Sequence, residues 1–259
     1  MLKLSVSRME ELFSLISGDR ALYLPLEAEG LAQFGQWSPG AKVQLDKLVT
    51  VKSPKDFFFP HTEDIAAFKV RNKEITIKDM RSDIEPFAVF GVRACDAESL
   101  KLLDRVFLSE PVDTFYESRR QNGTIITTAC LQPEESCFCP AFNIDAANPG
   151  GDAATWLLGD TLYWKSLTKR GDELTGKIKG LFEQAGSQEQ AAIEQAQAKA
   201  KEIFDKLPFK GLNLEGFTGK ALMEKFDSPQ WAELYPACLG CGTCIPNAAN
   251  VLPKLWIVT

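Results

Sequence analysis

The sequence predicts an α/β fold with three parts: a mixed-sheet domain over residues 1–165, a helical connecting segment over 166–227 and a short cysteine-containing module over 228–259. Two short apolar runs, Phe87–Val92 and residues 123–129, each have the composition of a buried strand and lie next to segments with helical periodicity. After residue 148 the pattern changes to one hairpin followed by mostly helical sequence. This order of elements is typical of an α/β domain followed by a helical extension.

Local periodicity predicts the elements of the first 80 residues. Gly18 is expected to end the first helix, and Asn72-Lys73 is expected to form the turn of a strand pair. The predicted elements are a helix over 8–16, strands over 21–26 and 43–51, and a strand pair over 67–70 and 74–77.

Two strand–helix units follow, and each brings a cysteine to the end of a strand. Phe87–Val92 leads through Cys95 into an amphipathic helix, for which Asp96 is the expected N-cap. Residues 113–120 are predicted as a helix, and the strand over 123–129 then leads to Cys130. Sites in α/β proteins are commonly built where strands end, so both cysteines are candidates for function.

The last hundred residues are predicted to contain a hairpin and several helices. Residues 155–164 resemble a hairpin around Gly159-Asp160, and a last short helix is expected to begin at Ser228-Pro229. Between them, residues 187–207 are predicted as an amphipathic helix packed on the domain, opened by a capping box of Ser187 and Gln190. Its apolar stripe consists of Ile193, Ala200, Ile203, Phe204 and Leu207.

Composition narrows the possible classes of function. A formal net charge of −6 argues against binding to duplex nucleic acid, which needs a basic surface. No apolar run approaches the roughly 20 residues of a membrane span, and the start of the chain shows no secretory signal, so a cytoplasmic location is expected. Seven cysteines with one histidine, His61, favour metal binding through reduced thiols over disulfides or a multi-histidine site.

The terminal triplet Cys238, Cys241 and Cys244 has the spacing C-x-x-C-x-x-C, with which bacterial ferredoxins begin to bind a [4Fe–4S] cluster. The fourth cysteine of that run is replaced here by Ala248 and Ala249. The module is therefore predicted as a ferredoxin-like fragment whose site is partial or empty. A non-cysteine ligand, a partner's ligand or a [3Fe–4S] cluster would also account for it, but a truncated or frame-altered chain is favoured. The alternatives are a zinc knuckle or ordinary buried cysteines.

The four central cysteines are Cys95, Cys130, Cys137 and Cys139, and four thiolates are the number that a [4Fe–4S] cluster takes. A helix that begins at Cys95 would stabilise an anionic cluster through its N-terminal amides, and Arg93 would add positive charge. Three alternatives remain: buried structural cysteines, a zinc site, and an enzyme in which Cys95 has a lowered pKa and His61 or a carboxylate is the base.

Several motifs together resemble the [4Fe–4S] dicluster-domain family, which includes sulfhydrogenase beta subunits and the iron–sulfur subunit of anaerobic sulfite reductases. These motifs are Phe57-Phe58-Phe59-Pro60 with Glu63, Gly91-Val92-Arg93-Ala94-Cys95-Asp96, Lys101-Leu102-Leu103-Asp104, Phe115-Tyr116 with Arg119-Arg120, Cys130-x-x-Pro133-x-x-x-Cys137-Phe138-Cys139, and the terminal triplet. Members commonly have proline at the position of Ala94 and continue into a complete two-cluster ferredoxin.

The resemblance implies an iron–sulfur subunit that relays electrons between a flavin/NAD(P)H-binding partner and a catalytic hydrogenase or sulfite-reductase-type subunit. By the motif match, Cys95, Cys130, Cys137 and Cys139 would hold one [4Fe–4S] cluster, and Cys238, Cys241 and Cys244 would belong to a ferredoxin-type site. No Gly-rich dinucleotide motif follows a predicted strand, which fits a relay whose nicotinamide and flavin are bound elsewhere.

Overall fold

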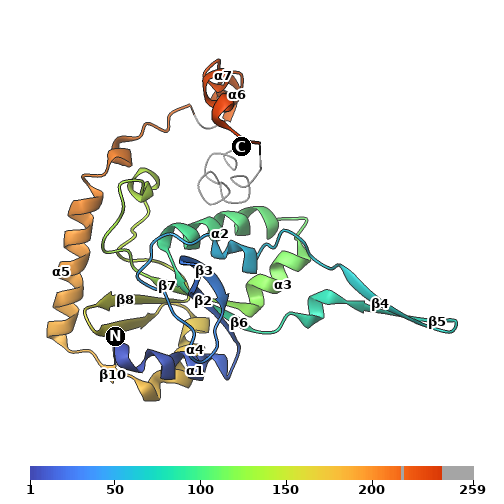
Figure 1. Ribbon diagram of the computed structural model, residues 1–259, viewed down its shortest axis with the longest axis horizontal. Coiled ribbons are helices and arrows are strands. Elements are labelled where there is room, and N and C mark those ends of the chain that lie inside the picture. Colours follow the sequence, from blue (N-terminus) through green and yellow to red (C-terminus); the bar gives the residue numbers. More distant parts are fainter. Residues whose placement is uncertain (217–218, 241–259) are drawn as a thin grey trace.

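A computed structural model describes residues 1–216 and 219–240 of the chain. Within these residues, eight strands form one sheet in the order β10-β1-β9-β8-β7-β6-β2-β3 (Figure 1). Strands β2, β6, β7 and β8 run parallel, and the others join them antiparallel, so the predicted mixed sheet is confirmed. The strands are β1 (Leu2–Ser5), β2 (Ala21–Ala28), β3 (Leu31–Gln36), β6 (Phe87–Val92), β7 (Gly123–Thr128), β8 (Ala153–Leu158), β9 (Thr161–Ser166) and β10 (Glu183–Gln184).

Helices cover both faces of the sheet. On one face α1 and α4 pack around Phe90 and Trp164, and on the other α2 and α3 pack around Val89 and Ile125. Val89 and Phe90 are neighbours in β6 but pack into the cores on opposite faces of the sheet, because successive side chains of a strand point to opposite faces. The helices are α1 (Met9–Ser17), α2 (Ala94–Phe107), α3 (Thr114–Asn122), α4 (Lys169–Ile178), α5 (Ser187–Phe204), α6 (Gly219–Phe226) and α7 (Trp231–Leu234).

Most elements predicted from periodicity are present. The helices expected near residues 8–16 and 113–120, the buried strands at 87–92 and 123–129 and the hairpin at 155–164 correspond to α1, α3, β6, β7 and the β8–β9 pair. The long amphipathic helix is α5, and it packs on the domain through Ile193, Ala200 and Phe204. Ile203, which was predicted in the same stripe, is 42% exposed.

The strand predicted over residues 43–51 is wrong, and the real third strand, β3, was missed. Val43 makes one isolated bridge to Leu26, beyond the point where β2 pairs with β6. After that bridge, the carbonyl groups of Leu45 and Lys47 accept hydrogen bonds from the Arg93 side chain. The alternation of apolar residues here therefore reflects packing of a loop.

Two helix starts also differ from prediction. Helix α2 begins at Ala94 with Arg93 as its N-cap residue, so Asp96 lies inside the first turn and is not the cap. Helix α5 begins after Gly186, whose N–H donates to Glu189 Oε2 at 2.8 Å, so the predicted box of Ser187 and Gln190 is wrong.

Strands β4 (Ala66–Arg71) and β5 (Glu74–Asp79) form a separate two-stranded sheet, as predicted. This pair, called the arm below, extends away from the domain in Figure 1. All twelve of its strand residues are exposed. The arm therefore adds nothing to the core of the domain.

The terminal part of the described chain contains α6 and α7, which lie beyond the end of α5 and away from the sheet (Figure 1). Cys238 follows α7 and is exposed. Cys241 and Cys244 lie outside the described residues, as does most of the predicted ferredoxin-like fragment. Across residues 1–216 and 219–240, no helix is long and apolar enough to cross a membrane.

Candidate metal centre

The four central cysteines come together in the structure. Cys139 belongs to a buried apolar group with Ala146, Ala200 and Phe204, and Cys95, Cys130 and Cys137 pack against the same group. Cys139 is 7% exposed, while the other three are half-buried. These four residues, called the cysteine cluster below, come from two segments of the chain, the start of α2 and the loop between β7 and β8. Their convergence is the main feature of the candidate site.

Sheet topology explains why the cysteine cluster forms. Strands β6 and β7 are parallel neighbours, so their carboxyl ends lie side by side. Cys95 lies in the first turn of α2, directly after β6, and Cys130 lies directly after β7. The prediction that both cysteines lie at the ends of buried strands is confirmed.

The loop after β7 supplies the other two cysteines. It is closed at its base, because the Cys130 N–H donates to the Ala146 carbonyl at 2.8 Å. The indole N–H of Trp156 on β8 donates to the Ala147 carbonyl at 2.8 Å, and Gln197 on α5 donates to the same carbonyl at 3.3 Å. A short helical turn begins at Cys139, with Pro140 in its second position. The loop is therefore attached to both the sheet and α5.

The pKa values of three of these thiols are raised by their surroundings. The pKa of Cys130 is raised to about 11 by burial, against which the nearby Arg93 guanidinium acts. A hydrogen bond with Cys139, together with burial, raises the pKa of Cys95, and burial raises the pKa of Cys137. The lowered pKa expected of a nucleophilic Cys95 is therefore wrong, because the hydrogen bond with Cys139 and burial both raise the pKa of this thiol.

Arg93 joins the segments that surround the cysteine cluster. Its side chain is 7% exposed and donates to the carbonyls of Leu45 at 2.6 Å and Lys47 at 2.7 Å. It also reaches the carbonyls of Thr128 at 3.5 Å and Ala129 at 3.4 Å, next to Cys130. One side chain thus fixes the end of β7 to the loop that follows residue 43, and it places a positive charge beside a candidate ligand.

Sequence reasoning missed a second group of polar residues beside Cys95. Asp96 accepts a hydrogen bond from the Ser53 hydroxyl at 2.8 Å, and Lys55 is buried nearby. Burial raises the pKa of Asp96 to about 6 and lowers the pKa of Lys55. Ser53 and Lys55 lie just before the Phe57-Phe58-Phe59 motif in the sequence. Their place next to this motif was the one sequence feature that could have indicated a role near Cys95. Phe58 is fully buried against Phe87 and Tyr116 in the core under α2 and α3.

Replacing Asp96 with asparagine is expected to stabilise the fold at about pH 7.5 by on the order of 1–3 kcal/mol. Because the folded-state pKa of about 6 lies above the value for an unfolded chain, Asp96 favours folding most at low pH and loses that contribution as pH rises through 6. Loss of an acidic group from the first turn of α2 acts in the opposite direction but is worth at most about 1 kcal/mol.

Urea unfolding followed between about pH 4 and pH 8 tests this expectation. The wild-type chain should lose stability across this range relative to the Asp96→Asn variant, and Asp160→Asn, at an exposed turn, should change stability by less than about 0.5 kcal/mol. A variant that is less stable than wild type at neutral pH would contradict the assignment.

A cavity of about 840 Å³ lies between α5 and the ends of the strands that lead to the cysteine cluster. Its walls include Arg93 and Ala129, from the strand ends, and Ala196 and Lys199, from α5. Across residues 1–216 and 219–240, no group of three or more His, Cys, Asp or Glu side chains is arranged to hold a single metal ion. The four cysteines therefore share an apolar setting beside an arginine, without being arranged here as a set of metal ligands.

A curated relative matches almost the whole chain. It is "Sulfhydrogenase 2 subunit beta" from Pyrococcus furiosus, 30% identical over 242 residues, which are 93% of this chain and 69% of the relative. The chain belongs to the sulfhydrogenase beta-subunit family. No family model matches this member, and no solved structure matches it.

Family membership supports the resemblance seen in the sequence motifs, and the structure shows where those motifs lie. The run of Gly91 to Asp96 contributes the end of β6 and the start of α2. Lys101 to Asp104 and Arg120 meet on the same face of the sheet, where Asp104 accepts hydrogen bonds from Tyr116 at 2.7 Å and from Arg120 at 2.7 and 2.8 Å. Glu63 pairs with Arg119 at 2.6 Å. Several family motifs therefore have structural roles around the strands that position the cysteine cluster.

Proposed function

We propose that this protein is an iron–sulfur electron-transfer subunit of a hydrogenase-type complex. The observation that carries the proposal is the cysteine cluster, in which four cysteines from two segments pack together at the ends of two parallel strands. Membership of the sulfhydrogenase beta-subunit family supports it. Cys95, Cys130, Cys137 and Cys139 would hold one [4Fe–4S] cluster, and when bound the cluster would accept and donate single electrons.

The surrounding residues suit an anionic, thiolate-bound group. Four thiolates bring negative charge into an apolar region, and Arg93 lies beside Cys130 to balance part of it. Helix α2 begins at Ala94, so the first amides of the helix are next to Cys95, at the positive end of its dipole. Ala200 and Phe204 of α5 pack in the same apolar group as the cysteines. Because the pKa values of Cys95 and Cys130 are raised in this setting, binding a cluster through their thiolates would release protons.

The wider assignment follows from the family. Electrons would pass between a flavin/NAD(P)H-binding partner and a catalytic hydrogenase or sulfite-reductase-type subunit, in the cytoplasm. The division of the chain at about residues 165 and 227 stays a prediction, as does a second, ferredoxin-type site that uses Cys238, Cys241 and Cys244.

Spectroscopy on anaerobically purified protein tests the function. We expect brown protein with broad absorption near roughly 400 nm that bleaches on reduction and returns on reoxidation. Reversible bleaching separates a redox relay from a purely structural cluster. Colourless protein with bound zinc would contradict the proposal and favour a structural or adaptor role. Metal-free protein inactivated by alkylation of one thiol would favour an enzyme.

A further inference from the structure

The arm has one apolar face and one polar face. Phe68 pairs with Ile77 and Val70 pairs with Ile75 across the two strands, so these four side chains lie on the same face. Their exposed fractions are 74% and 72% for the first pair and 57% and 66% for the second. The opposite face carries Ala67, Lys69, Arg71, Glu74, Thr76 and Lys78.

Such an arm is not expected to remain uncovered. A two-stranded hairpin alone is marginally stable in water, and a contiguous apolar patch on a protein surface usually marks an interface. The arm also leaves the outer edges of both strands open to pairing. An apolar partner surface would remove the four exposed side chains from water and hold the hairpin together.

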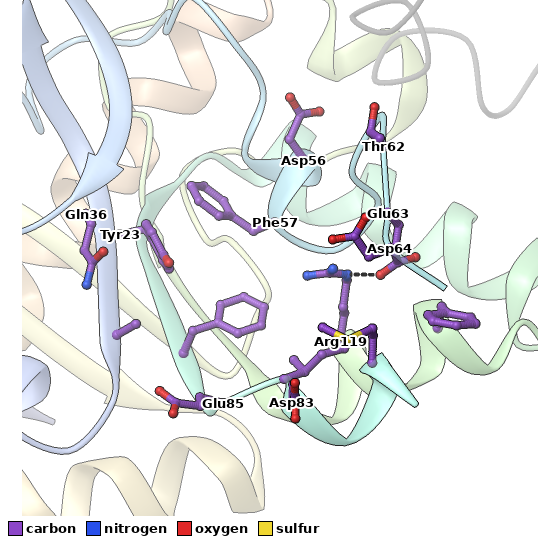
Figure 2. Close-up of a pocket in the computed structure, with 15 residues that line it drawn as sticks. Tyr23, Gln36, Asp56, Phe57, Thr62, Glu63, Asp64, Asp83, Glu85 and Arg119 are labelled. Atoms are coloured by element: carbon purple, nitrogen blue, oxygen red, sulfur yellow. Dashed lines mark hydrogen bonds and ion pairs between the residues drawn. The ribbon is translucent and has the colours of Figure 1, made fainter. Parts of the chain in front are cut away.

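A pocket of about 630 Å³ lies at the base of the arm, and its charge is opposite to that of the arm (Figure 2). Five acidic residues line it, against one basic residue, Arg119. Among the described residues, Glu63 pairs with Arg119 and Asp83 with Lys78 of the arm, while Asp64 and Glu85 take part in no ion pair. Aromatic side chains, including Tyr23, Phe57 and Phe115, complete the wall. The acidic residues of this acidic pocket are Asp56, Glu63, Asp64, Asp83 and Glu85.

The tip of the arm fits a pocket of this kind. Residues 66–79 contain four basic and two acidic side chains, although the whole chain has a formal charge of −6. Arg71 and Lys73 flank Asn72, which makes the turn with a φ of 56°. With six residues in each strand, the arm is roughly 20 Å long. The basic tip is thus held well away from the acidic pocket of its own chain.

We propose that two copies of this chain associate through their arms, which pack antiparallel with apolar faces together so that each basic tip enters the acidic pocket at the base of the other arm. A two-fold axis relates the copies, so one patch serves both partners and the contact closes without forming a filament. The apolar faces supply the central contact, and the charge pairs fix its direction and register. The commitment to a second copy rests on this complementarity between two surfaces of the same chain.

Sedimentation equilibrium of the full-length, anaerobically purified chain, over a hundredfold range of concentration, tests the proposal. We expect a dimer. Phe68→Asp is expected to raise its dissociation constant by at least roughly tenfold, because a charge replaces an apolar side chain at the centre of the contact. Leu31→Lys is the matched control, because Leu31 is 60% exposed on β3 and is expected to leave dimerisation unchanged.

Charge reversal tests where the tip goes. Arg71→Glu with Lys73→Glu, or Asp64→Lys with Glu85→Lys, should each weaken the dimer, whereas the four changes combined should restore it. Lys165→Glu with Lys169→Glu changes the net charge as the first pair does, at exposed positions outside the arm, and should have no effect.

Two results would overturn the proposal. A chain that stays monomeric throughout would indicate that a different protein covers the arm, and a dimer insensitive to Phe68→Asp would place the interface elsewhere. If the four combined changes fail to restore the dimer, the assignment of the tip to the pocket is wrong. Circular dichroism of each variant verifies that the fold is retained.

Discussion

Cys139→Ser is expected to remove about four iron atoms per chain from anaerobically purified protein, together with the corresponding absorption near roughly 400 nm. Cys139 is the most buried member of the cysteine cluster, and it forms a hydrogen bond with Cys95. Serine keeps the size of the side chain but is a far weaker ligand for iron than thiolate. Iron analysis and electron paramagnetic resonance of the reduced protein measure the loss.

Cys238→Ser is the matched control for this variant. Cys238 is exposed and lies beyond α7, outside the cysteine cluster. Its replacement is expected to leave the iron held by the four central cysteines unchanged. If Cys139→Ser retains its full iron content and spectrum, the central cysteines are structural and the proposed site is wrong.

Arg93→Met is expected to lower the free energy of unfolding by roughly 3 kcal/mol or more, because it leaves several buried carbonyl groups without a donor. The two short hydrogen bonds, to Leu45 and Lys47, carry most of this effect. Methionine fills a similar volume without charge, which limits the contribution from a cavity. Urea unfolding measures the change. Arg105→Met, at an exposed position of α2, should change stability by less than about 0.5 kcal/mol.

The same Arg93→Met variant carries a second expectation for the loaded protein. Removing a positive charge beside Cys130 destabilises the more negative, reduced form of a bound cluster, so the reduction potential should become more negative. Arg93→Lys should leave the reduction potential closer to that of the wild type, because lysine keeps the positive charge. It should still lower the free energy of unfolding, because lysine cannot donate to all four carbonyls. An unchanged potential in Arg93→Met would show that Arg93 has a purely structural role.

Local sequence patterns were sufficient for most of the sheet and helices. The apolar runs of β6 and β7, the turn residues of the arm and the helical stripe of α5 each describe a short segment, and each was predicted. Residues 43–51 were misread because alternation alone does not distinguish a strand from a loop that buries Leu45. Strand β3 was missed because its sequence, with Gly35 and two glutamines, has weak strand character.

The candidate site was predictable in its residues but not in its surroundings. The positions of Cys95 and Cys130 after buried strands indicated that they would meet. Nothing local placed Ala200 and Phe204 of α5 over the cysteines, or Asp96 beside Ser53. The raised pKa of Cys95 depends on these surroundings, so the helix position alone gave the wrong sign.

The sequence by itself determined the number of cysteines, their spacing and the periodicity of the elements that carry them, because these properties depend on neighbours along the chain. Only the tertiary structure decided that Cys95, Cys130, Cys137 and Cys139 share one apolar cluster beside Arg93. It also decided that the apolar face of the arm is uncovered and that an acidic pocket lies at its base. Strand order and packing bring together residues that are far apart in the sequence. The periodicity of one segment does not determine which other segment packs against it.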